Sequence, residues 1–308
     1  MIGKEEKMRY NNLRSYFREK YGKRLKKICI DGGFTCPNRD GKCGTGGCIF
    51  CGERGAGEHI DPKASIREQV LSVLDGAKDD ELFIAYFQNF TNTYAPVEVL
   101  RERYGAALID KRIKILDIGT RPDCITEEIC ELIASYKSTH DVIVELGLQT
   151  ASDETAKIIN RGYTSECFEQ AMRLLKKHEI DICVHLIIGL PGEGDAQVAK
   201  SCEYLSRFDI AGYKIHSIYV MRGTRLAEMY ERGEYSPPTE DEYVRRAAYI
   251  ISHISPDAIV HRLTGDCPDG LMLAPDWNSD KHALIAKINT YLEENNLTQG
   301  CYFDVFCK

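Results

Sequence analysis

The chain has 308 residues, 43% of them hydrophobic, and a formal net charge of −7. This length is enough for one barrel-type domain or two smaller ones, and the composition is ordinary for a globular protein. No run of eighteen apolar residues occurs and the start of the chain has no apolar signal core, so we expect neither a membrane span nor export. The thirteen cysteines are expected to be reduced thiols of a cytoplasmic protein, some of them bound to metal.

Residues 1–27 form a basic N-terminal segment with ten Lys or Arg and three acidic residues, a local charge of +7. Aromatic side chains such as Tyr10, Tyr16 and Tyr21 lie between the bases. A segment of this kind can contact phosphates while its rings stack on nucleic-acid bases. The alternative is a solvated terminal helix whose Leu13 and Phe17 dock on the rest of the protein. The sequence leaves both open.

A long loop is expected at residues 31–51, after a short strand at 27–30. Its many glycines exclude a helix or strand, and it holds four thiols within sixteen residues: Cys36, Cys43, Cys48 and Cys51. Such a cluster indicates a metal site. Four thiolates would close a structural zinc site, although only one pair has short spacing. Three would hold an iron–sulfur cluster and leave one iron open to a small molecule.

Helix and strand patterns alternate after this loop. We expect strands at 82–87, 113–118, 142–148, 180–188 and 213–220, with helices at 66–74, 96–109, from 126, at 168–178 and at 196–208. Helices of this length between strands imply right-handed crossovers and a parallel sheet. Six such units favour an α/β fold, a partial (β/α)6 TIM-like barrel, over an open doubly wound sheet.

The last part of the chain has a different pattern. A Ser-Pro-Pro turn at 236–238, a helix at 240–251, a strand at 259–263 and a helix at 281–293 are expected to extend or cap the barrel. No sharp boundary separates them from it. We therefore predict a barrel at 28–220 and a C-terminal α/β extension at 221–308 packed on it.

Chemistry in a parallel barrel lies at the carboxyl ends of the strands. Gln88 and Arg121 follow the second and third strands, and Gln149 follows the fourth. Glu145 lies within an apolar strand, where a charge without partners is costly to bury. His185 interrupts the fifth strand. Simpler explanations are available for three of these residues. Gln88 could lie in a polar turn, Arg121 could form a surface ion pair, and His185 could be a hydrogen-bonded core histidine.

The run Cys48-Ile49-Phe50-Cys51, preceded by GGFTCPNRDG, resembles the signature of radical S-adenosylmethionine (SAM) enzymes. Eleven residues separate Cys36 from Cys48, a spacing similar to that of the YtqA/YhcC group, which is related to the Elongator catalytic subunit. The resemblance implies that Cys36, Cys48 and Cys51 bind a [4Fe–4S] cluster, without Cys43. It also implies a radical SAM barrel and an enzyme that cleaves SAM to a 5′-deoxyadenosyl radical.

The same resemblance suggests where SAM lies. Gln88 takes the place of the family motif that holds the methionine amine, but it lacks the carboxylate charge. Glu145 and Gln149 match the ribose-binding strand, and Arg161 matches the position near the SAM carboxylate. The backbone of Ile188 and Gly189 matches the segment that approaches adenine.

The substrate expectation also comes from the resemblance. The motifs at 260–266 and 271–277 are similar to those of the YtqA branch, which implies a role in converting carboxymethylaminomethyl-uridine at the tRNA wobble position toward its aminomethyl and methylaminomethyl forms. A flavodoxin or ferredoxin is the expected electron donor. Candidates for binding the carboxylate or moving a proton are Arg121, His185, Lys214 and His216.

Several alternatives remain at this point. The substrate could instead be a peptide or a small molecule, and the protein could be a zinc-binding structural protein or an iron–sulfur electron carrier. A second metal site at Cys267, Cys301 and Cys307 is disfavoured because these residues are far apart in sequence and include no close pair.

Overall fold

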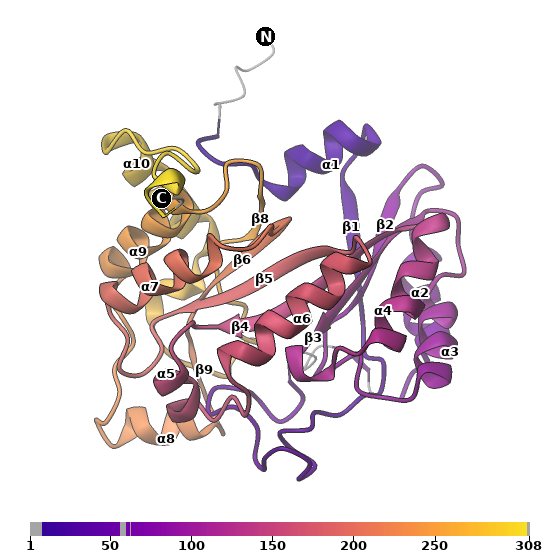
Figure 1. Cartoon of the computed structure of the whole chain (residues 1–308), viewed down its shortest axis with the longest axis horizontal. Helices are drawn as coiled ribbons and strands as arrows, with labels where there is room; N and C mark the ends of the chain where they lie inside the picture. The colour runs from indigo at the N-terminus through magenta and orange to yellow at the C-terminus, as the bar shows by residue number, and fades with distance from the viewer. Residues whose placement is uncertain (1–7, 56–59, 62, 307–308) are drawn as a thin grey trace.

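A computed structural model describes residues 8–55, 60–61 and 63–306 (Figure 1). The first seven residues of the basic segment and Cys307 lie outside these ranges. Seven parallel strands form one sheet in the order β1-β2-β3-β4-β5-β6-β8. The strands are β1 (Leu25–Ile30), β2 (Leu82–Phe87), β3 (Ile113–Thr120), β4 (Asp141–Gln149), β5 (Asp181–Ile188), β6 (Gly212–Ser217) and β8 (Ile259–Arg262).

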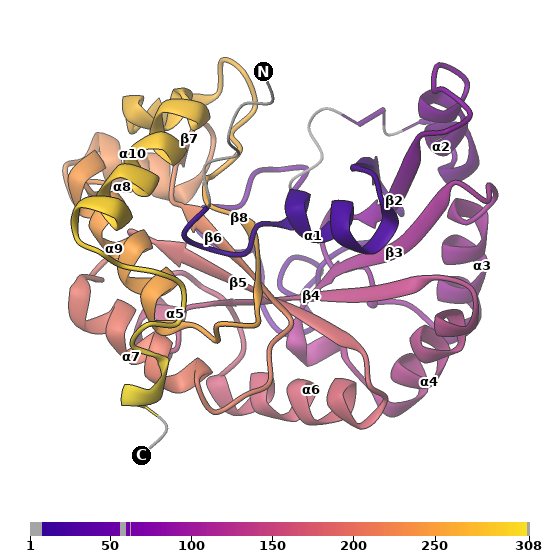
Figure 2. The same cartoon turned by 90° about the horizontal axis from the view of Figure 1, so that it is seen from above.

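The sheet is curled, and most helices cover its convex side (Figure 2). The helices are α1 (Leu13–Tyr21), α2 (Ile66–Leu74), α3 (Val97–Ala107), α4 (Glu127–Ser135), α5 (Asp153–Ile158), α6 (Ser165–Lys177), α7 (Asp195–Leu205), α8 (Arg225–Glu231), α9 (Glu240–His253) and α10 (Lys281–Glu294). Short 3-10 turns occur at Pro122–Cys124, Tyr136–Ser138, Asp276–Ser279 and Phe303–Val305. This architecture confirms the predicted partial barrel. Within the described residues, no helix combines the length and apolar composition needed to cross a bilayer.

Local sequence signals explain why the predicted helices begin where they do. Ser65 and Glu68 form a capping box at the start of α2, and Thr239 and Glu242 form another at α9. Each box satisfies backbone N–H groups that have no partner inside the helix. Thr126 caps α4 in the same way, by accepting a hydrogen bond from Ile129 N.

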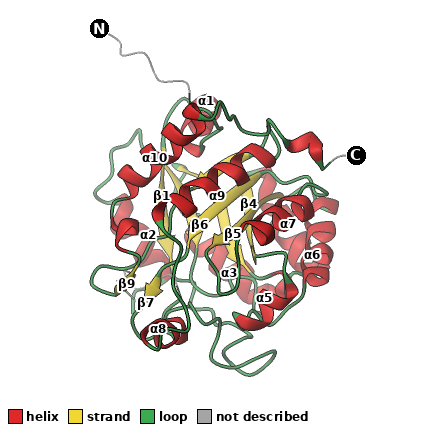
Figure 3. Cartoon of the chain, turned by 90° about the vertical axis from the view of Figure 1, so that its left-hand side faces the viewer, coloured by secondary structure: helices red, strands yellow, loops and turns green. Residues whose placement is uncertain are grey.

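The predicted sixth strand is too long. β6 ends at Ser217, and Val220–Met221 forms β7, which pairs with β9 (Met272–Ala274) in a separate two-stranded antiparallel sheet (Figure 3). The Ser217 hydroxyl accepts a hydrogen bond from Gly265 N at 2.6 Å and contacts Asn278 Oδ1 at 2.5 Å. These long-range contacts turn the chain, although the local pattern predicts one strand from 213 to 220.

The C-terminal segment contributes to the main sheet because β8 pairs in parallel with β6. The hydroxyl of Tyr243 in α9 donates a hydrogen bond to Leu263 O just beyond β8, at 2.7 Å. The predicted strand at 259–263 therefore becomes the seventh strand of the barrel. The domain limits at 27 and 220 remain a prediction.

The barrel interior has two layers. Nearest the amino ends of the strands, Ile84, Ile115 and Ile143 pack against Phe17 of α1 in an apolar cluster. Helix α1 lies across this end, opposite the loop at 31–51 (Figure 1). One layer further along, β1, β3, β4 and β6 carry the charged residues Lys27, Asp117, Glu145 and Lys214, which we call the polar layer. We call the two ends of the barrel the helix end and the loop end.

Candidate functional site

The loop at residues 31–51 brings three of its four thiols to one cavity at the loop end of the barrel. Cys36, Cys48 and Cys51 line this cavity of about 250 Å³, together with residues from β2, β3, β4 and β5. We call it the thiol cavity. Cys43 is exposed and does not line it. Its sulfur lies 3.5 Å from Arg121 Nη2 and 3.7 Å from Asp123 Oδ2.

Polar side chains hold the loop in this shape. The Asn38 amide donates a hydrogen bond to Asn160 O at 2.5 Å, and Asn160 Nδ2 donates in turn to Gly47 O at 2.8 Å. Arg39 Nη2 donates to the carbonyls of Cys51 and Gly52, at 3.1 and 2.5 Å. A β-carbon on Gly44 would lie 2.1 Å from Asn38 Oδ1, so this close approach requires glycine.

Glu145 connects the thiol cavity to the polar layer. It is fully buried, and its Oε2 lies 2.9 Å from both Tyr86 OH and His185 Nε2. The Lys214 ammonium also contacts this oxygen and lies 2.9 Å from Tyr86 OH. Glu145 therefore has the partners that a charge in an apolar strand requires, as the sequence suggested.

The polar layer continues across the barrel to β1. Lys27 Nζ lies 3.1 Å from Asp117 Oδ2 and 3.5 Å from Glu145 Oε1. Burial by itself would raise the pKa of Glu145, but the charges of Lys214 and Lys27 hold it well below its usual range. Burial and the nearby Glu145 charge raise the pKa of Asp117 to about 7. Burial lowers the pKa of Lys214 to about 8, against the attraction of Glu145.

Arg161 lines the thiol cavity but is fully buried and bonded to protein groups. Its guanidinium donates to the carbonyls of Leu148, Thr150 and Tyr163 and pairs with Asp153 at 3.2 Å. These contacts use all five N–H groups. Arg161 therefore fixes the end of β4, and its expected place near the SAM carboxylate remains a prediction.

Arg121 and Gln149 also line the cavity. The Arg121 guanidinium forms a fork with Asp123, at 2.9 and 2.7 Å, and its Nη1 donates to Arg161 O at 2.8 Å. Gln149 has a left-handed backbone conformation (φ 63°), and its Oε1 lies 3.1 Å from the hydroxyl of Tyr163. Gln88 lines the same wall, as expected from its position after β2.

Ile188 and Gly189 are not among the residues that line the thiol cavity. Gly189 lines a different pocket, and its carbonyl accepts a hydrogen bond from Tyr235 at 2.6 Å. Its φ of 98° and the proximity of Ile218 and Pro238, 2.6 Å from a hypothetical β-carbon, explain why glycine is needed here. Packing thus accounts for the glycine, and the expected approach of this backbone to adenine remains a prediction.

A second cavity of about 180 Å³ adjoins the thiol cavity, and we call it the histidine cavity. Both are lined by Phe50, Gln149, His185 and Tyr219. His216 lines only the histidine cavity, and its buried Nε2 has no hydrogen-bond partner within the described residues. Burial, together with the neighbouring His185, lowers the pKa of His216 well below its usual range, so the ring is neutral. Of the four catalytic candidates, Lys214 lines neither cavity.

Sequence reasoning missed Tyr86, Tyr163 and the pair Lys27 and Asp117. A signal for the charged pair was present. Asp117 interrupts an apolar strand just as Glu145 does, and in β1 Lys27 alternates with the buried Ile28 and Ile30. Side chains on a strand point alternately to its two faces. In a parallel sheet that curls into a barrel, charged residues at such alternating positions on several strands can therefore face the same interior. The two tyrosines gave no such signal because aromatic residues are common in strands and turns.

A curled parallel sheet with three thiols at the carboxyl ends of its strands defines the radical SAM class of enzymes. The sequence agrees. Residues 39–205 match the radical SAM superfamily and residues 210–294 match the radical SAM C-terminal domain. The chain belongs to the radical SAM superfamily, which excludes the zinc-protein and electron-carrier interpretations.

Within the superfamily, the chain is similar to YtqA of Bacillus subtilis (strain 168), with 37% identity over 96% of this chain and 93% of that protein. It is 34% identical to YhcC of Escherichia coli (strain K12) over 90% of each chain. A tRNA uridine(34) acetyltransferase of Methanocaldococcus jannaschii is 30% identical over 62% of this chain and 35% of that protein. Among solved structures, an N-terminally truncated Elp3 of Methanocaldococcus infernus has a TM-score of 0.66 at 22% identity, covering 91% of this chain and 65% of that one.

The cofactors of this family are a [4Fe–4S] cluster and SAM, and the residues present fit them. Three thiols from one loop suit a cluster with one iron left open. One buried oxygen on the wall of the thiol cavity, Thr91 Oγ1, has no hydrogen-bond partner among the described residues, so the wall offers a hydroxyl to a polar ligand.

Proposed function

We propose that Cys36, Cys48 and Cys51 hold the cluster and that the thiol cavity holds SAM. When bound, these cofactors supply a one-electron reagent that removes a hydrogen atom from carbon. The protein binds and shields them. Gln88, Thr91 and Gln149 are placed to orient the polar parts of SAM, and Arg161 keeps the end of β4 in position.

The histidine cavity is the proposed place for the reacting part of the substrate. It adjoins the thiol cavity through four shared residues and contains the neutral imidazole of His216, whose Nε2 has no hydrogen-bond partner among the described residues. A neutral imidazole can accept or donate a hydrogen bond, and the low pKa of His216 keeps it in that form at neutral pH. His185, anchored to Glu145, and His216 have ring centroids 5.1 Å apart and form one wall.

We further propose that the substrate is a tRNA wobble uridine carrying a carboxymethylaminomethyl group, which the enzyme converts toward the aminomethyl form. The observation that supports RNA is the similarity to tRNA uridine(34) acetyltransferase across 195 residues. The chemistry is consistent. The CH2 between nitrogen and carboxylate leaves a stabilised radical when its hydrogen is removed. Transfer of one more electron to an oxidised protein carrier, such as a flavodoxin or ferredoxin, would give an imine, which water hydrolyses to the aminomethyl group and glyoxylate. Arg121 at the cavity wall is the candidate for the carboxylate.

The test uses nucleoside analysis. tRNA from cells lacking the gene would be digested and its wobble nucleosides compared with those of wild-type cells. Accumulation of the carboxymethylaminomethyl form supports the proposal, and re-expression of a Cys48→Ala variant should fail to reverse it. An unchanged profile would reject the tRNA substrate and favour a peptide or small molecule.

A further inference from the structure

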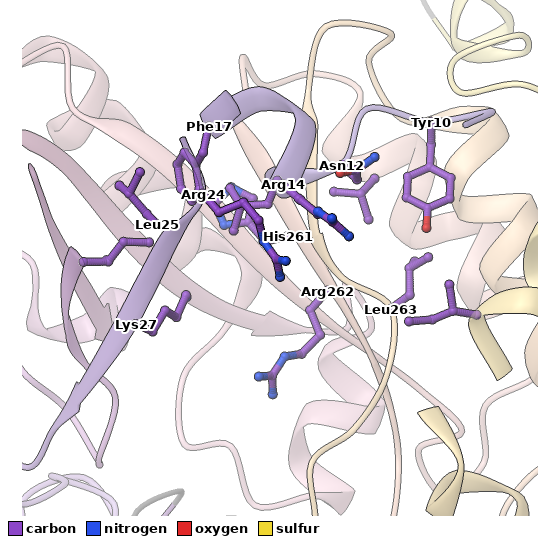
Figure 4. A pocket seen from close by; sticks show the side chains of 14 residues that line it. Tyr10, Asn12, Arg14, Phe17, Arg24, Leu25, Lys27, His261, Arg262 and Leu263 are labelled. Atoms are coloured by element: carbon purple, nitrogen blue, oxygen red, sulfur yellow. The ribbon is translucent and has the colours of Figure 1, made fainter. Parts of the chain in front are cut away.

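A separate basic cavity of about 310 Å³ lies at the helix end of the barrel (Figure 4). It is bounded by α1, by the start of β1 and by β8, the two edge strands of the sheet. Helix α1 spans these edges, and an isolated parallel bridge between Asn12 and Val260 ties its start to β8. The cavity is thus built from both ends of the sequence and is remote from the cysteines.

The walls of this cavity carry positive charge only. Arg14, Arg24, Lys27 and Arg262 line it, and no acidic residue is among the described residues that do. In a chain of net charge −7 this is a local exception. Figure 4 shows the side chains of Arg14 and Arg24 near each other, with Lys27 to their left and Arg262 below them.

Ion pairs within the protein already neutralise several of the basic residues, both in the basic segment and at the cavity wall. Lys20, Lys23 and Lys26 form ion pairs with Asp141, Asp80 and Glu81 on neighbouring parts of the barrel. Lys27 pairs with Asp117 and Glu145, and Arg262 lies 3.7 Å from Asp266.

Two arginines of the segment differ from these lysines. Among the described residues, Arg14 and Arg24 have no acidic partner within ion-pair distance. Both belong to the wall of the basic cavity. Part of the uncompensated charge of the basic segment therefore lies at this cavity.

Neutral hydrogen-bonding groups complete the lining. Burial raises the pKa of Tyr10 to about 12, so its phenol keeps its proton and can donate a hydrogen bond. His261 Nδ1 is buried without a hydrogen-bond partner in the part of the chain that the structure describes. Burial lowers the pKa of His261 to about 3, so its ring is neutral and adds no charge. A buried polar atom without a partner indicates a missing ligand or water.

We propose that this cavity binds the phosphate group of a nucleotide or of an RNA backbone. One guanidinium can satisfy the two oxygens of a carboxylate, whereas the guanidinium groups of Arg14 in α1, Arg24 just before β1 and Arg262 in β8 suit the larger number of oxygens on a phosphate. The volume corresponds to about ten water molecules at roughly 30 Å³ each, which leaves room for a sugar attached to the phosphate. The site is independent of the proposed wobble substrate, because it lies at the other end of the barrel.

The test compares two double variants with the same change in charge. Arg14→Gln/Arg24→Gln removes the two unpaired arginines of the cavity. Lys23→Gln/Lys26→Gln, the matched control, removes two paired lysines of the same segment. Binding of inorganic phosphate, AMP and tRNA would be measured by calorimetry and filter binding at several salt concentrations, with circular dichroism confirming that each variant is folded.

We expect the arginine variant to bind at least tenfold more weakly than wild type and the lysine variant to bind within twofold of it. Loss of AMP binding without an effect on tRNA would identify a free nucleotide. Parallel losses, with a smaller salt dependence for tRNA, would identify the RNA backbone. The proposal is wrong if wild type binds none of the three probes saturably, or if both variants bind equally. None of these outcomes depends on the nucleoside analysis.

The single variant Arg24→Gln keeps the test informative if the double variant is unstable. It should show an intermediate loss of affinity, since one of the two guanidinium groups remains. Affinity equal to that of the lysine control would again count against the site.

Discussion

The two ends of the barrel are built from the same strands but differ in what their side chains do. At the helix end, Ile84, Ile115 and Ile143 meet Phe17 in a packed apolar cluster. At the loop end the wall of the thiol cavity is polar and partly unsatisfied, since Thr91 Oγ1 has no hydrogen-bond partner among the described residues. In the apolar cluster protein side chains satisfy one another by packing, whereas the thiol cavity leaves a group that a ligand can satisfy.

The polar layer separates these two regions. Its residues are charged, but they pair with one another, through Lys27–Asp117 and Lys214–Glu145. The comparison teaches that polarity alone does not identify a binding site in this barrel. The informative feature is a buried polar group without a partner beside a cavity.

The largest expected effect concerns the thiols of the loop end. Cys36→Ala, Cys48→Ala and Cys51→Ala should each abolish the brown colour and bound iron of anaerobically reconstituted protein. The Cys43→Ala variant is the control and should keep both, because its sulfur lies outside the thiol cavity. Iron analysis gives the answer. Equal loss of iron in Cys43→Ala would refute the proposed ligand set.

The polar layer should be sensitive to an unbalanced charge. Glu145→Gln leaves Lys214 and Lys27 without their shared partner, and breaking a buried ion pair in this way costs about 3–5 kcal/mol. Denaturant unfolding measures this. A second change, Lys214→Met, in the same chain should recover part of the loss, since the buried ammonium is then gone. Full additivity of the two changes would show that the pair is not coupled.

At the helix end, we expect a substitution to lower stability without changing the affinity for SAM. Phe17→Ala removes a buried ring from the apolar cluster and should lower the free energy of unfolding by about 3–5 kcal/mol. SAM affinity of the folded variant should stay unchanged, because Phe17 does not line the thiol cavity. A large loss of SAM affinity would mean that the two ends are coupled.

Asp117 allows a test by pH. Burial and Glu145 raise the pKa of Asp117 to about 7, so the folded protein keeps a proton that the unfolded chain, with a pKa of about 3.9, releases. Stability from this site is present below about pH 4 and is lost as the pH rises to about 7. Asp117→Asn should therefore show a smaller fall in unfolding free energy than wild type between pH 5 and 7. Parallel pH curves would contradict this.

The smallest expected effect is at Gln149. Gln149→Asn shortens the side chain but keeps a residue type that tolerates the left-handed backbone conformation found there. We expect SAM to bind about tenfold more weakly, which corresponds to about 1.4 kcal/mol. Unfolding should be unaffected, and equilibrium dialysis would measure the affinity. Unchanged affinity would remove Gln149 from the proposed binding wall.

Much of the fold follows from local patterns. The helix at 66–74 and the strand at 82–87 were predicted with the observed limits, because a capping box starts the first and a continuous apolar run defines the second. The end of β6 was not predictable, since Ser217 is fixed by Gly265 and Asn278, residues far away in sequence. A local pattern contains no information about such partners.

The candidate site was predictable to a similar degree. Cys36, Cys48 and Cys51 share one loop, and the structure brings them to one cavity. The structural roles of Arg161 and Gly189 could not be predicted, because both depend on how neighbouring chain segments use their hydrogen bonds and space. The expected contacts of both with SAM remain predictions. The basic cavity could not be predicted, since it joins Arg14 and Arg24 to a strand more than two hundred residues away.

The seam that joins the chain ends has a consequence for biosynthesis. Residues 9–12 are held by segments near the other end of the sequence: Gln299 N donates to Arg9 O, and Val260 N donates to Asn11 O. During translation these contacts can form only after residue 299 has left the ribosome, whereas the cysteine loop emerges long before. Closure of the seam is therefore a late step of chain synthesis, completed after the cysteine loop has emerged.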